Sequence, residues 1–387
     1  MPPFQTGFAT VDITPPPGLP LMGNARSDYA ARGVHDPLHA KAVVFADAAG
    51  NKAAVLSVDL CMVDRDNVAL IRRTIGDGCD VPPESVLVHA THTHSGPFPT
   101  NFLDFDVDLA PFRDQIEVFL RNAASAVVEA NRHLAEARLS VGATTEDRLA
   151  FPRRLRRKDG STQMNWEALA PGFRPEEIEA PWGRSDPEVS CLVVEQGGRP
   201  VSAVVNFGLH PAILAGDNWL YSADYPGYLA ESLRRTRGEG FVSLFLNGCC
   251  GDVNHIDYRD PLQGRGFQMT QRVGYMLGAA ACEAIRGRHA VEANRVAASS
   301  EQVTLGRIRI DDEERRRCAR IVEEAAKEPA EGLVDGLPDV YFAETRLRMA
   351  AQQDQPDKVE VQVLRIGEVA LVGLPGEIGR ASCRERV

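Results

Sequence analysis

The chain has 387 residues, of which 44% are hydrophobic and 25% are charged, and its formal net charge is −11 at pH 7. This length and composition allow one large or two ordinary globular domains with a substantial core. The charged residues are spread along the chain, which argues against the clustered basic surface of a nucleic-acid-binding protein. No run of about 18 apolar residues is present, so no transmembrane segment is expected.

The predicted elements alternate between strands and helices. In chain order we expect strands at residues 40–47 and 52–59, a helix over 65–75 with Asp64 as its N-cap, a strand at 85–88, a helix at 114–133, strands at 191–195 and 201–207, a helix at 228–235, a strand at 241–246, helices at 270–285 and 312–327, and strands at 359–365 and 369–373. The basic run at residues 153–158 is expected to be a solvated loop. No internal repeat and no low-complexity linker is visible, so one continuous α/β unit is the simplest interpretation.

The N-terminus and the cysteines bear on the compartment. The first residues, MPPFQTGFATVDITPPPG, lack the cationic segment and apolar run of a secretory signal. Eight cysteines without regular spacing in a chain of this length are typical of reduced thiols. Both features favour a cytoplasmic location.

Three of the nine histidines lie within six positions at the end of an apolar strand. The strand period of two predicts that His92 and His94 share one face, and neutral imidazole is the commonest metal ligand in proteins. A structural role remains equally open for an isolated pair of this kind, and His89 is interpreted as a packed or hydrogen-bonded histidine.

Three further apolar strands end in polar or turn-forming residues. His210 precedes Pro211, which ends the extended run; the sequence NGCCGDVNH follows the strand at 241–246; and Glu377 follows LVGLPG. Glycines at such ends permit tight turns and close approach to a ligand. Four clusters of this kind together favour a metal site built from strand ends, although each is weak alone.

Several ordered segments resemble the motifs of one family, the neutral/alkaline non-lysosomal ceramidases. They are TGFATVDITPP near the start, LMGN at 21–24, RGVHDPLHAKAVVF at 32–45, THTHSGP at 91–97, NFGLHP at 206–211, SADYPGY at 222–228, GCCGDVN at 248–254 and GLPGE at 373–377. The resemblance covers nearly the whole chain. It implies mixed β-sheets flanked by helices, and a zinc amidase that cleaves the N-acyl bond of ceramide, with zinc held by His92, His210 and Glu377.

The resemblance also implies roles around the metal. His94 would face the substrate, the backbone N–H of Gly23 would help to bind the oxyanion, and Arg153 would contact the substrate. Asn254 stands where characterised members of the family have a serine usually assigned as the nucleophile, and asparagine cannot replace it. We therefore expect zinc-activated water as the nucleophile, with Asp252 or His94 moving protons.

The last ten residues match the in-frame translation of a sequencing-library adapter. We expect residues 378–387 to be an artefact and residues 1–377 to be a catalytic domain that is incomplete at its C-terminus. The family's fourth ligand, a tyrosine, and its immunoglobulin-like domain would then be absent.

Two alternatives to a zinc-dependent ceramidase remain. One is a zinc hydrolase of another small amide or ester, and the other is an inactive metal- or ligand-binding descendant. An oxidoreductase is disfavoured because no G-x-G-x-x-G follows the first strand. The expected partner is a small-molecule or lipid substrate, and the sequence predicts no oligomeric state.

Overall fold

The computed structural model describes residues 3–24, 26, 28–100, 107–327, 333–334 and 337–379. The chain forms two compact units, the larger made of Met1–Thr100, Asp108–Ser299 and Gln362–Val387, the smaller of Asn101–Val107 and Ser300–Val361. The sequence did not indicate the smaller unit. Of the suspected adapter segment, residues 380–387 lie outside the described residues, so its origin stays a prediction.

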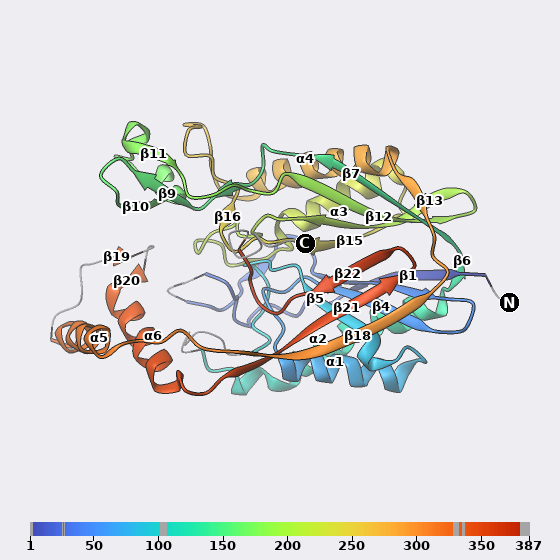
Figure 1. The fold of residues 1–387 in the computed structure, drawn as a ribbon, viewed down its shortest axis with the longest axis horizontal. Helices are drawn as coiled ribbons and strands as arrows, with labels where there is room; N and C mark the ends of the chain where they lie inside the picture. The colour runs from blue at the N-terminus through green and yellow to red at the C-terminus, as the bar shows by residue number, and fades with distance from the viewer. Residues whose placement is uncertain are drawn as a thin grey trace. The chain divides into compact units, whose positions relative to one another are not determined.

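The first sheet of the larger unit has five strands in the order β5-β4-β3-β1-β6. The strands are β1 (Gln5–Asp12), β3 (His39–Ala46), β4 (Lys52–Val58), β5 (Val86–Ala90) and β6 (Ala135–Glu136). Only β4 and β5 are parallel neighbours, and the other pairs are antiparallel. Helices α1 (Arg65–Gly78) and α2 (Arg113–Arg132) cover its outer face (Figure 1).

The second sheet has the order β15-β13-β12-β7-β17. Its strands are β7 (Arg138–Thr145), β12 (Glu188–Gln196), β13 (Arg199–Phe207), β15 (Val242–Asn247) and β17 (His289–Val291). Again one pair, β13 and β15, is parallel, and the others are antiparallel. Helices α3 (Asp224–Arg237) and α4 (Phe267–Arg286) cover the opposite outer face (Figure 1).

The two sheets repeat one topology. In chain order, β1, β3, β4, α1, β5, α2 and β6 correspond to β7, β12, β13, α3, β15, α4 and β17, with the same neighbours and directions. A glycine allows close strand–helix contact at matching places: a Cβ on Gly7 would lie 2.0 Å from the Ala130 carbonyl oxygen, and one on Gly142 2.0 Å from that of Ala284. The sequence analysis found no internal repeat. The amino-acid sequence indeed shows none, but the fold repeats the same strand order and directions.

The core explains why the central strands are continuously apolar. Leu192 and Val194 of β12 pack toward the first sheet, whereas Cys191 and Val193 pack toward α3 and α4. A strand buried on both faces loses the alternation of polar and apolar residues that marks a half-exposed strand. The larger unit is therefore two helix-covered sheets with an apolar layer between them, as the resemblance implied.

Short elements surround the two sheets. They are β2 (Gly33–Val34), β8 (Phe151–Pro152), β9 (Arg154–Arg157), β10 (Thr162–Met164), β11 (Ile178–Pro181), β14 (Leu220–Tyr221), β16 (Val253–Asn254) and the 3-10 helices Pro83–Ser85, Ala110–Phe112, Asn165–Leu169 and Pro175–Glu177. The basic run expected to be a loop is largely strand β9, which pairs with β10 and β11. That prediction was wrong because the ladder, and not the charge of the side chains, sets the backbone conformation.

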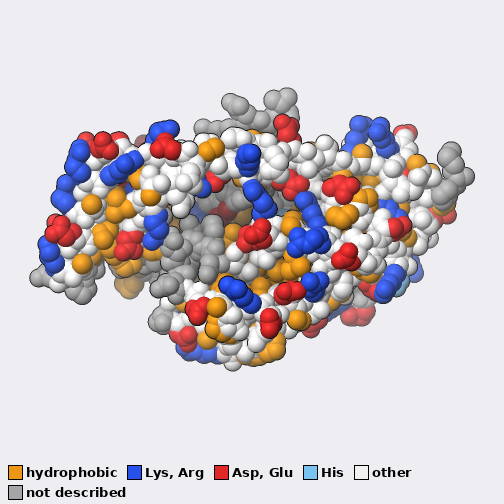
Figure 2. Space-filling view, turned by 90° about the horizontal axis from the view of Figure 1, so that it is seen from below, with side chains coloured by type: hydrophobic (Ala, Val, Ile, Leu, Met, Phe, Trp, Pro, Cys, Tyr) orange, Lys and Arg blue, Asp and Glu red, His pale blue; other side chains and the backbone are white. Residues whose placement is uncertain are grey.

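The smaller unit contains α5 (Asp312–Ala325), α6 (Asp339–Gln352), β19 (Leu333–Val334) and β20 (Leu337–Pro338). Strands β18 (Val296–Leu305) and β21 (Asp357–Ile366) cross the boundary between the units, and β22 (Val369–Gly373) pairs with β21. Asp311 caps α5 by accepting a hydrogen bond from the Glu314 N–H at 2.8 Å. No described helix is long and apolar enough to cross a bilayer. On the face drawn in Figure 2, acidic and basic side chains are interspersed.

Candidate metal site

The ends of the two parallel strand pairs are joined by hydrogen bonds. Ser57 Oγ on β4 donates to the Phe245 carbonyl on β15 at 2.7 Å, and the Asn247 N–H donates to His89 Nε2 at 3.0 Å. Burial lowers the pKa of His89 to about 3, so its ring is neutral. His89 is thus hydrogen-bonded inside the fold, as interpreted from the sequence, and it helps to bring the loops after both sheets to one place.

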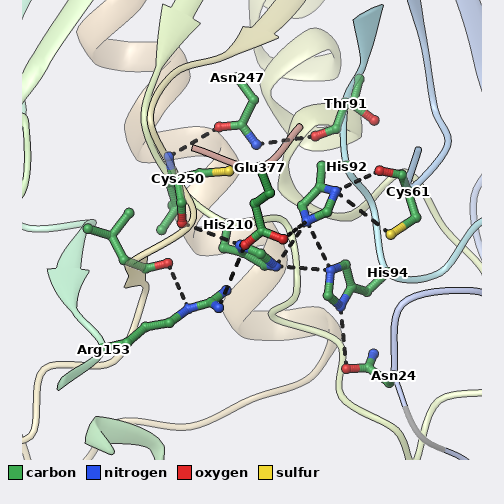
Figure 3. A network of polar contacts seen from close by, with 12 residues as sticks. Asn24, Cys61, Thr91, His92, His94, Arg153, His210, Asn247, Cys250 and Glu377 are labelled. Atoms are coloured by element: carbon green, nitrogen blue, oxygen red, sulfur yellow. Dashed lines mark hydrogen bonds and ion pairs between the residues drawn. The ribbon is translucent and has the colours of Figure 1, made fainter. Parts of the chain in front are cut away.

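His92 lies in the loop after β5 and not on the strand. The strand ends at Ala90, and His92 has a φ of 72°, so strand alternation does not place His92 beside His94; that part of the prediction was wrong. The Nδ1–H of His92 donates to the Cys61 carbonyl at 2.6 Å, and its Nε2 faces the other histidines (Figure 3). A non-glycine residue at positive φ is strained and persists where its surroundings fix it.

His94 is held through its backbone. Its N–H donates to the Pro211 carbonyl at 3.0 Å, and its carbonyl accepts from Arg26 Nη2 at 3.0 Å. Gly23 packs against it so closely that a Cβ would lie 2.4 Å from His94 Cγ. These contacts direct His94 Nε2 to a point 3.3 Å from His92 Nε2.

His210 and Glu377 complete the cluster. His210 is 2% exposed, and its Nε2 lies 3.1 Å from His92 Nε2 and 2.9 Å from His94 Nε2. Its Nδ1 lies 3.1 Å from Glu377 Oε1 and 3.4 Å from the Cys250 carbonyl. Glu377 Oε2 lies 3.3 Å from His92 Nε2, so one carboxylate faces both rings (Figure 3).

The donor set fits a zinc ion. Ligand atoms of His92, His210 and Glu377 lie within 4.8 Å of one another. The Nε2 atoms of His94 and His92 lie at similar distances from His210 Nε2, 2.9 and 3.1 Å. Two imidazoles and a carboxylate are usual zinc ligands, and bond lengths of 2.0–2.1 Å around a tetrahedral ion separate neighbouring ligand atoms by about 3.3 Å. Three imidazole Nε2 atoms within 2.9–3.3 Å of one another need a positive charge among them, and a bound metal ion can supply it.

The electrostatics are consistent with this fit. Burial, together with the charge of Arg153, lowers the pKa of His210 to about 3, and burial with neighbouring His210 lowers that of His94. Burial opposes protonation of His92 too, but Cys61 and Glu377 raise its pKa to about 10. Burial would raise the pKa of Glu377, yet hydrogen bonds from His210 and His92 hold it well below its usual range. The site therefore favours one positive charge beside Glu377, which a metal ion can supply.

Arg153 faces the cluster from the junction of β8 and β9. Its Nη1 lies 3.8 Å from Glu377 Oε1 (Figure 3), its Nε donates to the Val253 carbonyl at 3.3 Å, and its backbone N–H donates to the Asp252 carbonyl at 2.8 Å. Burial lowers its pKa. A guanidinium group thus lies on the Glu377 side of the cluster.

Of the remaining predicted site residues, Gly23 and Asp252 contact residues of the site, and Asn254 contacts Asn165. Gly23 is beside His94, and Asp252 contributes its carbonyl to Arg153 as described. Asn254, in contrast, is buried against Asn165, with which it exchanges two hydrogen bonds of 2.7 Å. The roles assigned to His94, Asp252, Asn254, Gly23 and Arg153 stay predictions.

Sequence reasoning missed the groups that hold the histidines. The carbonyls of Cys61 and Cys250 face the Nδ1 atoms of His92 and His210, and Asn247 Nδ2 donates to the Thr91 carbonyl at 3.4 Å. Asn247 follows a predicted strand and was visible as part of a cluster. Backbone carbonyls leave no signal in the side-chain pattern.

Comparisons with known proteins agree with this architecture. A family model described as neutral/alkaline non-lysosomal ceramidase, N-terminal, matches residues 4–255. Neutral ceramidase B of Dictyostelium discoideum is 28% identical in an alignment 266 positions long that covers 65% of this chain and 35% of the relative. The neutral ceramidase of Mycobacterium tuberculosis is 23% identical in an alignment 413 positions long, gaps included, that covers 92% of this chain and 62% of the relative.

Solved structures show the same fold. The crystal structure of the neutral ceramidase from Pseudomonas aeruginosa matches with a TM-score of 0.71 at 20% identity, over 97% of this chain and 62% of that one. A ceramidase complexed with C2 matches with a TM-score of 0.68 at 19% identity. The chain spans less than two thirds of the length of each of these proteins. Because the family model matches more than half of the residues, the chain belongs to the neutral/alkaline non-lysosomal ceramidase family.

Proposed function

We propose that this chain is a zinc-dependent hydrolase of N-acyl bonds, with ceramide-like lipids as its first candidate substrates. The observation that carries the proposal is the convergence of His92 Nε2, His210 Nε2 and Glu377 Oε2, in which the two nitrogens lie 3.1 Å apart and the oxygen lies 3.3 Å from His92 Nε2. These three residues would hold the ion. When bound, zinc supplies a Lewis acid that polarises an acyl carbonyl and makes water a stronger nucleophile at neutral pH.

The protein's own groups would orient the substrate and move protons. His94 is neutral, and its Nε2 faces the other two imidazoles, so it would act as a proton acceptor beside the acyl carbon. The backbone N–H of Gly23, next to His94, would donate to the developing oxyanion, an interaction on the order of 3 kcal/mol. Arg153 would hold a polar group of the substrate on the Glu377 side.

A serine nucleophile has no counterpart at position 254. Asn254 is buried and hydrogen-bonded to Asn165. The side chains at this position therefore favour water, and not a side-chain hydroxyl, as the nucleophile. The same departure from the family's pattern favours keeping a second candidate, a zinc hydrolase of another small amide or ester.

Release of acyl chains from matched substrates tests the proposal. Zinc-loaded protein is expected to release fatty acid from a short-chain ceramide, and His94→Ala is expected to lower kcat by about 10²-fold or more while zinc content stays the same. His133→Ala is the control, because this side chain is 61% exposed on the protein surface. Cleavage of a simple N-acyl amine or ester, but not of ceramide, would select the second candidate. A zinc-loaded wild type that cleaves none of them would contradict both.

A further inference from the structure

We propose that Asn254 and Asn165 form a positioning pair that holds Arg153 beside the metal site, and that Asn254 acts through Arg153 instead of contacting the substrate. The inference rests on the proposed function for Arg153. It gives a role to Asn254, which stands where characterised members of the family have a serine.

The two amides are matched to each other. Asn165 Nδ2 donates to Asn254 Oδ1, and Asn254 Nδ2 donates to Asn165 Oδ1, both at 2.7 Å. Asn165 is fully buried and Asn254 is 8% exposed. The second hydrogen of Asn165 Nδ2 goes to the Ile256 carbonyl at 2.8 Å, and Asn254 Oδ1 also accepts from the Ile256 N–H at 2.9 Å. A buried polar network this fully satisfied gives a unique local geometry.

Hydrogen bonds connect Arg153 to Asn165 and to the residues just before Asn254. The backbone N–H of Asn165 donates to the Arg153 carbonyl at 2.7 Å. On the other side, Asp252 and Val253, just before Asn254, accept from the backbone N–H and the Nε of Arg153. Strand β16, which contains Asn254, pairs with β8, which ends immediately before Arg153. The amide pair therefore joins the two segments that hold Arg153 from opposite sides.

The contacts that hold Arg153 are mainly with backbone groups. Within the described part of the chain, its ion pair is with Glu377 Oε1 at 3.8 Å, which is longer than a charge-assisted hydrogen bond. Its side chain is only 20% exposed, so contacts within the protein, and not contacts with water, fix its position. The backbone contacts are what set the guanidinium position relative to the cluster.

The chemistry of the pair selects asparagine at position 254. A serine has its donor and its acceptors on one oxygen of a shorter side chain, so it would match the amide of Asn165 less closely than a second amide does. An ionised aspartate has no hydrogen to donate and would place its charge against Asn165 Oδ1. Truncation at Asn254 leaves Asn165 Oδ1 buried without its donor, and truncation at Asn165 leaves Asn254 Nδ2 buried without its acceptor.

A double-mutant cycle tests the coupling. Asn254→Ala and Asn165→Ala are each expected to lower kcat/KM for the N-acyl substrate by about 10- to 100-fold, because a misplacement near 1 Å has effects of that size. In an Arg153→Ala background, Asn254→Ala should cause no further loss, since both changes act through one group. Zinc content should be unchanged in all variants. Leu277→Ala, at a buried core position of α4, is the control for a general loss of stability: it should lower Tm without changing the effect of Arg153→Ala.

Two results would overturn the inference: full additivity of Asn254→Ala with Arg153→Ala, or an unchanged kcat/KM in both asparagine variants. A wild type without turnover would mark a failure of the proposed function instead. In that case a crystal structure of Asn254→Ala decides: the guanidinium of Arg153 should leave the Val253 carbonyl, and an unmoved Arg153 would refute the pair's role.

Discussion

The contact between Gly23 and His94 links backbone conformation to the site at the scale of single residues. Gly23 has a φ of 106°, and its Cα faces the His94 ring. Any side chain at this position must displace the ring as well as adopt an unfavourable backbone conformation. Gly18 has a similar φ of 118° but nothing within 4 Å of a Cβ.

Gly23→Ala and Gly18→Ala separate these two effects. Both substitutions should destabilise the fold by about 1–3 kcal/mol through backbone strain. Only Gly23→Ala should also lower kcat/KM, by roughly 100-fold, because it moves His94. Urea unfolding and acyl-release kinetics measure the two quantities, and equal kinetic losses in both variants would contradict the role given to this contact.

The residues of the cluster could be predicted only in part. His92, His210 and Glu377 were visible because each follows an apolar strand within a family motif, and the structure brings them together. The expected reason for the pairing of His92 with His94 was wrong, since the strand ends before both. The partner of Asn254 was not predictable, because Asn165 is 89 residues away in the sequence and no pattern joins the two.

Helix α3 begins with a buried carboxyl that joins two segments near His210. Asp224 is fully buried at a φ of 54°. Its Oδ2 accepts from the N–H groups of Ile213 and Leu214, each at 3.1 Å, and its Oδ1 from the N–H of Tyr225 at 2.6 Å. Burial raises its pKa to about 7, above the value of about 3.9 in an unfolded chain.

The sign of the resulting pH dependence follows from the raised pKa. Between about pH 4 and 7 the folded state keeps a proton on Asp224 that the unfolded state has lost, so the contribution of this carboxyl to stability falls as the pH rises. Asp224→Asn cannot titrate. The free energy of unfolding of the wild type, minus that of the variant, should therefore decrease from about pH 4.5 to 7.5 in urea titrations. A wild-type-minus-variant difference that rises between pH 4.5 and 7.5 would contradict the raised pKa of Asp224. The control is Asp217→Asn at an exposed position, for which the difference should not show this decrease.

The long elements were predictable because their patterns are local. Helix α2 matches its predicted range within one residue at each end, and Asp64 caps α1 as expected, accepting from the Asn67 N–H at 2.8 Å. Strands β8 and β16 escaped prediction, since each has two residues and exists only through pairing across about 100 positions. The repeated topology escaped for a similar reason: it is a property of strand neighbours, and the two halves share no visible residue pattern.

At the scale of the molecule, the cluster joins chain segments that are far apart. His92 follows the first sheet, His210 follows a strand of the second, and Glu377 follows β22. A ligand that binds only the folded state stabilises it, by about 2.7 kcal/mol when its free concentration is one hundred times Kd. Metal bound by these residues would therefore hold together both halves of the repeated fold.

Removal of metal should lower Tm. Chelation of the zinc-loaded wild type is expected to lower Tm by several degrees, and re-addition of zinc should restore it. His92→Ala should have the lower Tm from the start and should not respond to chelation. An identical Tm with and without chelator in a zinc-loaded wild type would contradict a structural contribution of the metal.

The central claim is that His92, His210 and Glu377 hold one metal ion, and metal content tests it most directly. Elemental mass spectrometry of the purified wild type should find about one zinc per chain, as expected for a single site. His210→Ala should have lost it, and His133→Ala should retain it. A folded wild type that binds no zinc when supplied with it would contradict the account and leave the cluster as a set of packed histidines without a catalytic metal.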